Sequence, residues 1–170
     1  MIRAATKYDI DAIMSIVRSA QLSLRELGID QWQDGYPSRS SIIDDIDSGI
    51  GYVACVDDIV VGYAAIVLTG EPAYEQIDDA WRAGSDYVVV HRLCVDATSR
   101  RSGIAIKLMR KAATMAREKG YPAFRIDTHK GNIRMMSMMQ KLGFEHVGMI
   151  RYDSGDREAF ELNLGLSNIL

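Results

Sequence analysis

Apolar residues recur along the chain at two spacings, one typical of helices and one typical of strands. Ile10, Ile13 and Val17 follow helical spacing after Thr6, which with an acidic residue three positions later predicts a capped helix start. The run Tyr87–Val95 is rich in valine and predicts a strand. The same reasoning predicts helices near 7–27, 38–48, 103–119 and 132–142, a helical turn near 73–81, and strands near 2–5, 51–56, 59–69, 87–95, 124–128, 144–152 and 158–164.

The order of these elements predicts an α+β fold of three layers, α/β/α, around a mixed and mostly antiparallel sheet. The strand 87–95, the helix 103–119 and the strand 124–128 form a central β-α-β unit, which we expect to be right-handed with parallel strands. No repeat and no linker rich in proline, glycine or serine divides the chain. We therefore expect a single domain over residues 1–170.

Composition narrows the function classes. The chain has 170 residues, of which 48% are hydrophobic, and a formal net charge of -3. This balance lacks the basic footprint of a nucleic-acid-binding protein, so we expect no nucleic-acid partner. Cys55 and Cys94 lie in apolar runs and are predicted to be buried free thiols. Neither a secretory leader nor an apolar stretch long enough to cross a bilayer is present, which favours the cytoplasm and no membrane partner.

The segment 93–105 carries the most informative chemistry, because a strong strand ends, a polar loop turns and a helix begins. The first turn of a helix exposes backbone N–H groups whose dipoles favour an anion. Arg100 and Arg101 add cationic donors, while Gly103 and Ala105 leave the backbone accessible. These features predict a seat for a phosphate or diphosphate. The alternative is an ordinary capped loop with solvated arginines.

Two motifs in this order resemble those of the GCN5-related N-acetyltransferases. Arg100-x-x-Gly103-x-Ala105 is similar to the acetyl-coenzyme A signature of that family, Q/R-x-x-G-x-G/A. Asn132 followed by the run 141–144 resembles the family's asparagine-led helix that closes on Gly-Phe. The resemblance implies a family fold and transfer of an acetyl group from acetyl-CoA to a primary amine, most simply of a small molecule. A protein or peptide acceptor, or a non-catalytic acyl-CoA-binding regulator, remains open.

The resemblance also implies a role for each matching residue. Backbone N–H groups of Arg101 to Ala105 would bind the diphosphate, and Leu93 and Val95 would pair with the pantetheine arm as an added strand would. A backbone N–H of this strand would stabilise the oxyanion. The cofactor-binding residues expected are Leu93, Cys94, Val95, Arg100, Arg101, Ser102, Gly103, Ile104, Ala105 and Asn132.

His91 is the candidate general base, since an unperturbed imidazole titrates near neutral pH. It lies two residues before Leu93, so both side chains leave the same face if the strand is regular. A core or sheet-end histidine is the alternative interpretation. Glu75 is the second choice, although a solvated surface charge is its simpler role. His129 and His146 are predicted to be a strand-end and a sheet residue, and no histidine pair has metal-ligand spacing, so no metal is expected.

The chain departs from the family pattern at Met139, where many members carry a tyrosine that protonates the leaving sulfur. Methionine has no proton to donate. Either the thiolate leaves unassisted or the protein binds the cofactor without turnover; we favour the first interpretation.

An aromatic loop between the first two helices is expected to wall the acceptor site, opposite the segment near residue 75. Aromatic rings and carboxylates suit a small cationic amine, but the same rings could simply anchor the loop. The resemblance also allows a homodimer, which the sequence neither supports nor excludes. The acceptor-site residues expected are Trp32, Tyr36, Tyr74 and Glu75.

Overall fold

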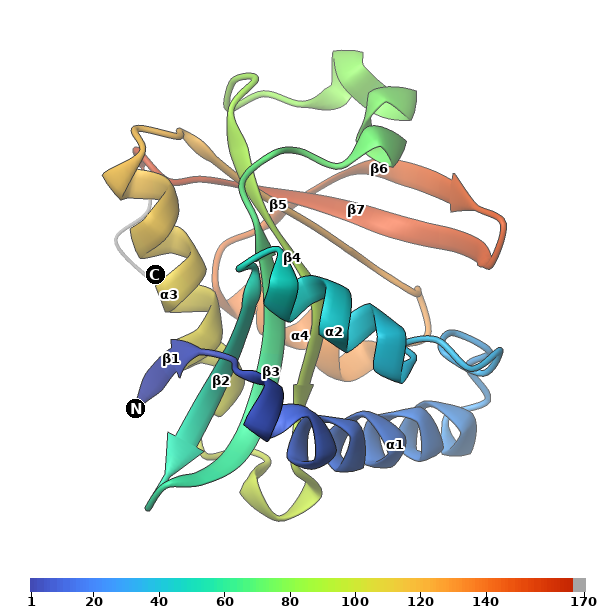
Figure 1. The fold of residues 1–170 in the computed structure, drawn as a ribbon. Helices are drawn as coiled ribbons and strands as arrows, with labels where there is room; N and C mark the ends of the chain where they lie inside the picture. Colours follow the sequence, from blue (N-terminus) through green and yellow to red (C-terminus); the bar gives the residue numbers. More distant parts are fainter. Residues whose placement is uncertain (167–170) are drawn as a thin grey trace. The chain divides into compact units, whose positions relative to one another are not determined.

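The chain folds into a mixed sheet with helices between its strands (Figure 1). The computed structural model describes residues 1–166. Within them, seven strands form one sheet in the order β1-β2-β3-β4-β5-β7-β6. Along the chain the elements are β1 (Ile2–Ala4), η1 (Lys7–Asp9), α1 (Ile10–Glu26), α2 (Arg39–Asp47), β2 (Gly51–Val56), β3 (Ile59–Val67), η2 (Pro72–Ala80), β4 (Tyr87–Val95), η3 (Ala97–Ser99), α3 (Ile104–Glu118), β5 (Ala123–Thr128), α4 (Ile133–Lys141), β6 (Glu145–Tyr152) and β7 (Gly155–Asn163).

This order confirms the α+β class and the mixed sheet. β1 with β2, β2 with β3, β5 with β7 and β6 with β7 all pair antiparallel. The exception is β4, which pairs parallel with β5 through Tyr87–Val89 and Ala123–Arg125. Both strands continue past this register, β4 to Val95 and β5 to Thr128.

The described residues divide into two compact units, and β3, β4 and α3 contribute residues to both. Unit 1 comprises Met1–Ile66 and Val90–Lys111, and unit 2 comprises Val67–Val89 and Ala112 onward. The prediction of one domain stays a prediction.

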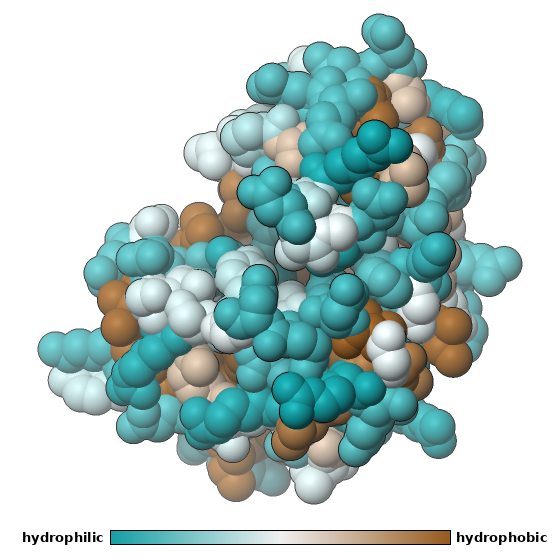
Figure 2. All heavy atoms as spheres, turned by 90° about the vertical axis from the view of Figure 1, so that its right-hand side faces the viewer, coloured by the Kyte–Doolittle hydropathy of each residue, from teal (hydrophilic) through white to brown (hydrophobic). Residues whose placement is uncertain are grey.

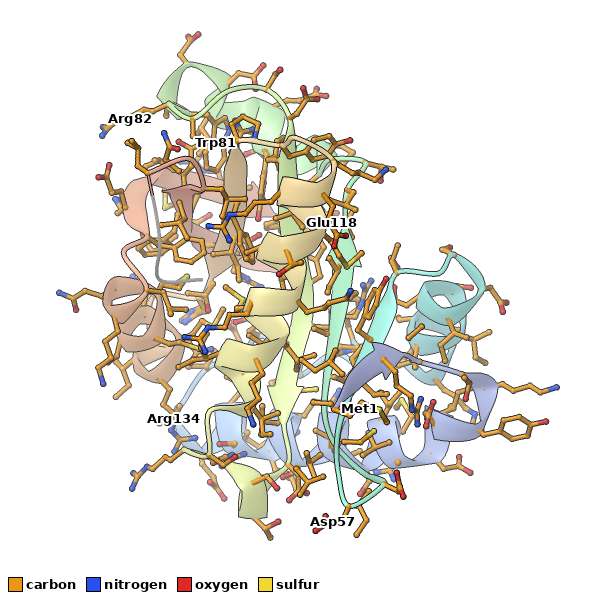
Figure 3. All side chains as sticks on the ribbon, turned by 90° about the vertical axis from the view of Figure 1, so that its left-hand side faces the viewer. Met1, Asp57, Trp81, Arg82, Glu118 and Arg134 are labelled. Atoms are coloured by element: carbon orange, nitrogen blue, oxygen red, sulfur yellow. The ribbon has the colours of Figure 1, made fainter. Side chains whose placement is uncertain are left out.

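Unit 1 encloses a core that α1, α2 and the strands build from residues at the predicted helical and strand spacings. Ile13, Val17 and Ile42 are fully buried against Val53 and Tyr63. The β2–β3 hairpin turns at Asp57 and Asp58, both with positive φ, and Asp57 lies at its tip in Figure 3. Positive φ at both central positions is the geometry that matches the twist of a tight hairpin.

Unit 2 is organised around a buried ion pair that the sequence pattern did not predict. Arg125 Nε donates to Glu161 Oε1 at 3.1 Å, and both residues are buried. The guanidinium lies between two rings, 4.3 Å from the centroid of Trp81 and 4.0 Å from that of Tyr87. Glu161 also accepts the Arg82 backbone N–H at 2.7 Å. Because every charge here has a partner, the pair ties the end of η2 to β5 and β7 without leaving a buried charge unpaired.

The visible surface of the molecule is mostly hydrophilic (Figure 2). Figure 2 shows one face of the molecule, on which hydrophilic side chains predominate and hydrophobic ones are interspersed in small groups. In the part of the chain that the structure describes, none of the helices combines the length and apolarity needed to cross a membrane.

The start of η1, which leads directly into α1, is stabilised by a carboxylate that satisfies several donors at once. Asp9 Oδ2 accepts the backbone N–H and the hydroxyl of Thr6, each at 2.8 Å, as the capping box predicted. Arg3 binds both carboxylate oxygens at 2.8 Å. These hydrogen bonds, with Arg3 first, lower the pKa of Asp9 from 3.8 to about 2.

We predict that Asp9→Asn lowers the free energy of unfolding by about 1–2 kcal/mol at pH 7. Because the folded-state pKa is depressed, this stabilisation is complete above about pH 4 and is lost as the pH falls toward 2. Urea denaturation at several pH values measures it, and the difference from wild type should shrink across that window. Asp11→Asn is the control, since the ion pair of Asp11 with Arg39 is exposed on both sides. Equal effects of the two substitutions would contradict this account.

Candidate active site

The loop between β4 and α3 presents backbone N–H groups at the start of a fifteen-residue helix. Asp96 caps the start of η3 by accepting the Thr98 backbone N–H at 2.9 Å. The chain then turns through Arg101 and Gly103, whose φ angles are +65° and +79°. The Gly103 carbonyl accepts the Lys107 N–H at 3.0 Å, which places Gly103 at the helix cap. The N–H groups of the first turn therefore lack intrahelical acceptors and form the positive end of the helix dipole.

Gly103 is required by the backbone conformation. A Cβ built at this position would meet nothing within 4 Å, so there is room for a side chain. The φ of +79° lies in the left-handed region, which favours glycine. The open space beside this backbone also leaves room for a ligand at the first turn of α3.

The charge beside this turn is cationic. Arg101 and Ser102 are exposed, whereas Arg100 is half-buried. Asp96 is the nearby carboxylate, and its pKa is lowered by hydrogen bonds from Thr98 and by the charge of Arg100. The Asp96 carboxylate is committed to capping η3, so the arginines remain the charged groups best suited to an anion.

β4 contains a left-handed residue where the sequence predicted a regular strand. Arg92, between His91 and Leu93, has a φ of +56°. The side chains of His91 and Leu93 were expected to leave the same face of the strand if the strand is regular. The left-handed residue between them breaks the regular alternation on which that expectation depends. His91, Arg92 and Leu93 are all half-buried, in contrast to the fully buried stretch Val88–Val90 before them.

Arg92 is held by a buried carboxylate. Arg92 Nη1 lies 3.0 Å from Asp45 Oδ1, and Tyr63 donates its hydroxyl to Asp45 Oδ2 at 2.6 Å. Burial raises the pKa of Asp45, while the Tyr63 hydrogen bond and the charges of Arg92 and His91 oppose that shift. The same burial and the neighbouring Asp45 raise the pKa of Tyr63. His91 therefore lies within electrostatic range of Asp45.

Sequence reasoning missed this cluster, although one signal was available. Asp45 lies three residues after Ile42 and one before Ile46, on the apolar side of a short helix. A carboxylate on a buried helical face needs a partner, which points to a buried ion pair. The identity of the partners could not be read from spacing, because Tyr63 and Arg92 lie 18 and 47 residues away.

Cys94 and Cys55 are buried free thiols, as predicted. Burial raises the pKa of Cys94 to about 12, so its thiol stays protonated at neutral pH. A protonated, buried thiol is a poor nucleophile. The geometry therefore favours direct attack by an acceptor over a covalent intermediate on Cys94.

The aromatic loop before α2 contributes Tyr36 to the Arg92 cluster. The guanidinium carbon of Arg92 lies 5.3 Å from the centroid of the Tyr36 ring, and Tyr36 is 39% exposed. Trp32 is half-buried and packs against the core of unit 1. Of the two roles left open, Trp32 has the contacts of an anchor, and Tyr36 retains an accessible ring.

The expected site residues of unit 2 have other partners. Asn132 caps α4, with Oδ1 accepting the Met135 N–H at 3.3 Å. Met139 is fully buried. Tyr74 differs from an acceptor-site wall: it is 1% exposed and donates its hydroxyl to Asp127 Oδ2 at 2.9 Å. Tyr74 is buried because it packs in the core of unit 2 against Trp81, which also donates its indole N–H to the Tyr74 carbonyl. Glu75 is exposed on η2.

The remaining histidines lie where the sequence placed them. His129 follows β5, and its Nδ1 accepts the Gly131 backbone N–H at 3.0 Å. His146 lies in β6, with Nε2 2.6 Å from Glu158. Across residues 1–166 no group of three or more His, Cys, Asp or Glu side chains is arranged to hold a metal ion.

Comparison with known proteins gives a consistent family. The model of the acetyltransferase (GNAT) family matches residues 15–144. A GNAT-family acetyltransferase structure from Streptococcus agalactiae is 33% identical, with a TM-score of 0.85 over 96% of this chain and 94% of that one. A structure described as a putative acetyltransferase from Staphylococcus aureus is 23% identical, with a TM-score of 0.75 over 96% of this chain and 99% of that one.

A curated relative matches over a shorter stretch. It is GCN5-related N-acetyltransferase 6, chloroplastic, from Arabidopsis thaliana, 33% identical over 76 residues. The match covers 45% of this chain and 26% of that protein. The chain thus spans about a quarter of the plant protein.

We predict that Gly103→Ala lowers the free energy of unfolding by about 1 kcal/mol, because alanine adopts the left-handed region at a cost and meets no clash here. Gly103→Asn is the matched variant and should lose less, since asparagine tolerates this conformation better. Thermal denaturation of the ligand-free protein measures both. If the asparagine variant is the less stable of the two, φ at this position does not explain the glycine.

Proposed function

Because the chain belongs to the GNAT family of acetyltransferases, we propose that it transfers an acetyl group from acetyl-CoA to the primary amine of a small molecule. The single observation that carries the proposal is the turn at Gly103, which opens α3 beside two arginines at the end of the half-buried part of β4. The proposal is supported by backbone N–H groups and cationic side chains that directly follow a strand containing a left-handed residue. That combination suits a long ligand with a diphosphate at one end and a reactive thioester at the other.

The proposed cofactor contacts lie in unit 1. N–H groups from Arg101 to Ala105 bind the diphosphate, and Arg100 adds charge. The backbone of Leu93 and Val95 pairs with the pantetheine arm. Acetyl-CoA supplies the acyl group as a thioester, which an amine attacks directly. Asn132 belongs to unit 2, where its side-chain oxygen caps α4, so its role as a cofactor contact stays a prediction from the sequence.

His91 is proposed to remove the proton from the attacking amine. Its half-buried side chain belongs to β4, next to the residue that interrupts the strand. A backbone N–H of Leu93, Cys94 or Val95 stabilises the tetrahedral oxyanion. Glu75 is the less favoured base, because its side chain is exposed on η2 and a solvated surface charge is its simpler role.

The leaving thiolate needs no dedicated acid in this proposal. Met139 has no proton to give and is fully buried. Ser137 lies on the exposed side of α4 and is poorly placed for the task. With a pKa near 8.5, taking cysteine as the reference, a thiolate leaves without assistance at a tolerable cost.

The acceptor class rests on the aromatic loop. Tyr36 offers an accessible ring beside Arg92, and Asp34 accepts the Tyr36 N–H at 3.3 Å in the same loop. A ring and a carboxylate at one loop suit a small amine through cation–π and charge contacts. A peptide acceptor, or a regulator that binds acyl-CoA without turnover, gives different results in the assays below.

We predict that CoA raises the thermal stability of the protein. At 100 times its Kd, a ligand that binds only the folded state adds about 2.7 kcal/mol. Arg100→Ala and Arg101→Ala should each weaken CoA binding, because each removes a charge beside the diphosphate seat. Arg151→Ala is the control, since Arg151 is an exposed residue of β6. Differential scanning calorimetry and titration with CoA measure the effect. Equal CoA affinity in all three variants would place the diphosphate elsewhere.

We predict that the protein releases free CoA from acetyl-CoA in the presence of small amines, and that His91→Ala lowers kcat/KM by about 100-fold or more. A thiol-release assay over polyamines, aromatic amines, amino acids and peptides measures both. His146→Ala is the control, because His146 is exposed in β6 and paired with Glu158. Turnover with peptides alone identifies a peptide acetyltransferase, and CoA binding without turnover on any acceptor identifies a regulator. Near-normal turnover by His91→Ala removes this residue from the mechanism.

A further inference from the structure

β4 contains a left-handed residue that is not glycine. Arg92 has a φ of +56° and lies between His91 and Leu93, the proposed base and a proposed oxyanion donor. Residues other than glycine seldom adopt this conformation, and they keep it where surrounding contacts hold it. The conformation therefore needs an anchor elsewhere in unit 1.

Two contacts hold the Arg92 side chain, and a third holds its carboxylate partner. Asp45 Oδ1 lies 3.0 Å from Nη1, and the Asp45 and Arg92 side chains are 5% and 18% exposed. Tyr63 fixes the other oxygen of Asp45 through a hydrogen bond of 2.6 Å. Tyr36 covers the guanidinium with its ring. Tyr63 of β3 therefore holds the Asp45 carboxylate, and this carboxylate in turn holds Arg92 of β4.

We propose that Asp45 is a positioning residue that keeps Arg92 of β4 in its left-handed conformation. It thereby aims the His91 side chain at the reacting amine and the Leu93 N–H at the thioester. This inference rests on the proposed function, in which those two groups act. Asp45 itself is buried, and its role is exerted through Arg92.

In this proposal the site requires the backbone conformation at position 92 and not the guanidinium itself. Arg92 Nε is buried and has no hydrogen-bond partner among residues 1–166, so the Asp45 ion pair is central to holding this cation. A residue that adopts positive φ without help would not need the anchor. Glycine is that residue, whereas valine resists this conformation most strongly.

The test compares two double variants on acetyl transfer to the best amine of the panel. Asp45→Asn should lower kcat by about tenfold, because the cost of a left-handed residue is no longer offset. CoA affinity should fall by less than kcat does, since the diphosphate seat lies outside the cluster and only the pantetheine contact at Leu93 adjoins it. Adding Arg92→Gly to Asp45→Asn should restore most of the lost kcat. Adding Arg92→Val should not.

The two double variants both remove the cation, so loss of charge cannot explain a difference between them. Thermal denaturation checks that each variant is folded. Should Asp45→Asn fail to fold, Arg92→Gly and Arg92→Val in the wild-type background make the same comparison, with glycine expected to retain at least about tenfold more kcat. Equal kcat for the glycine and valine variants overturns the inference, as does wild-type kcat in Asp45→Asn.

A structural readout separates this inference from the proposed function. Crystal structures of Asp45→Asn and of Asp45→Asn with Arg92→Gly report φ at position 92 directly. We expect the single variant to lose the left-handed conformation and the double variant to keep it. If wild type acetylates no amine, the proposed function fails, and these structures still decide the role of Asp45. A positive φ retained in Asp45→Asn overturns it.

Discussion

The ion pair between Asp45 and Arg92 sets the conformation of the strand on which the site depends. β4 begins as a regular parallel partner of β5 and is left-handed at Arg92, three residues after the paired stretch ends at Val89. Since a β-strand alternates its side chains and its backbone donors, one left-handed residue changes the direction of both on either side of it. The buried carboxylate offsets the conformational cost, and Tyr63 keeps that carboxylate in place.

The loop that follows β4 supplies a second backbone feature a few residues later. Arg101 and Gly103 have positive φ and open α3 with unpaired N–H groups. The strand and the helix start together offer backbone donors to both ends of a long ligand. In this arrangement the side chains near the site do not carry all the chemistry: Cys94 is protonated and buried, and Met139 is apolar. In the proposed mechanism, binding and positioning rest largely on the main chain, and His91 is the group that moves a proton.

The sequence predicted the features that arise from local signals. The capped helix start at Thr6 and the bounds of β4 both follow from neighbouring residues. The parallel pairing of β4 with β5 followed from element order, and the family followed from two short motifs.

Features that arise from long-range packing were not predicted. The partners of Asp45 come from β3 and β4, and spacing along α2 gives no information about them. Tyr74 was expected in the wall of the acceptor site and is 1% exposed, because Asp127 accepts its hydroxyl hydrogen bond and Trp81 packs on its ring. Regular alternation along β4 was assumed because valine-rich runs are usually regular, and nothing in the residue type of Arg92 indicates a positive φ.

The most direct test is a crystal structure of the protein with an unreactive acetyl-CoA analogue, in which a ketone replaces the thioester. The diphosphate should lie against the N–H groups of residues 101–105, and the ketone oxygen should accept a hydrogen bond from a backbone N–H of residues 93–95, with residue 92 still left-handed. An analogue bound with its ketone remote from β4, or with its diphosphate away from the start of α3, would contradict the account.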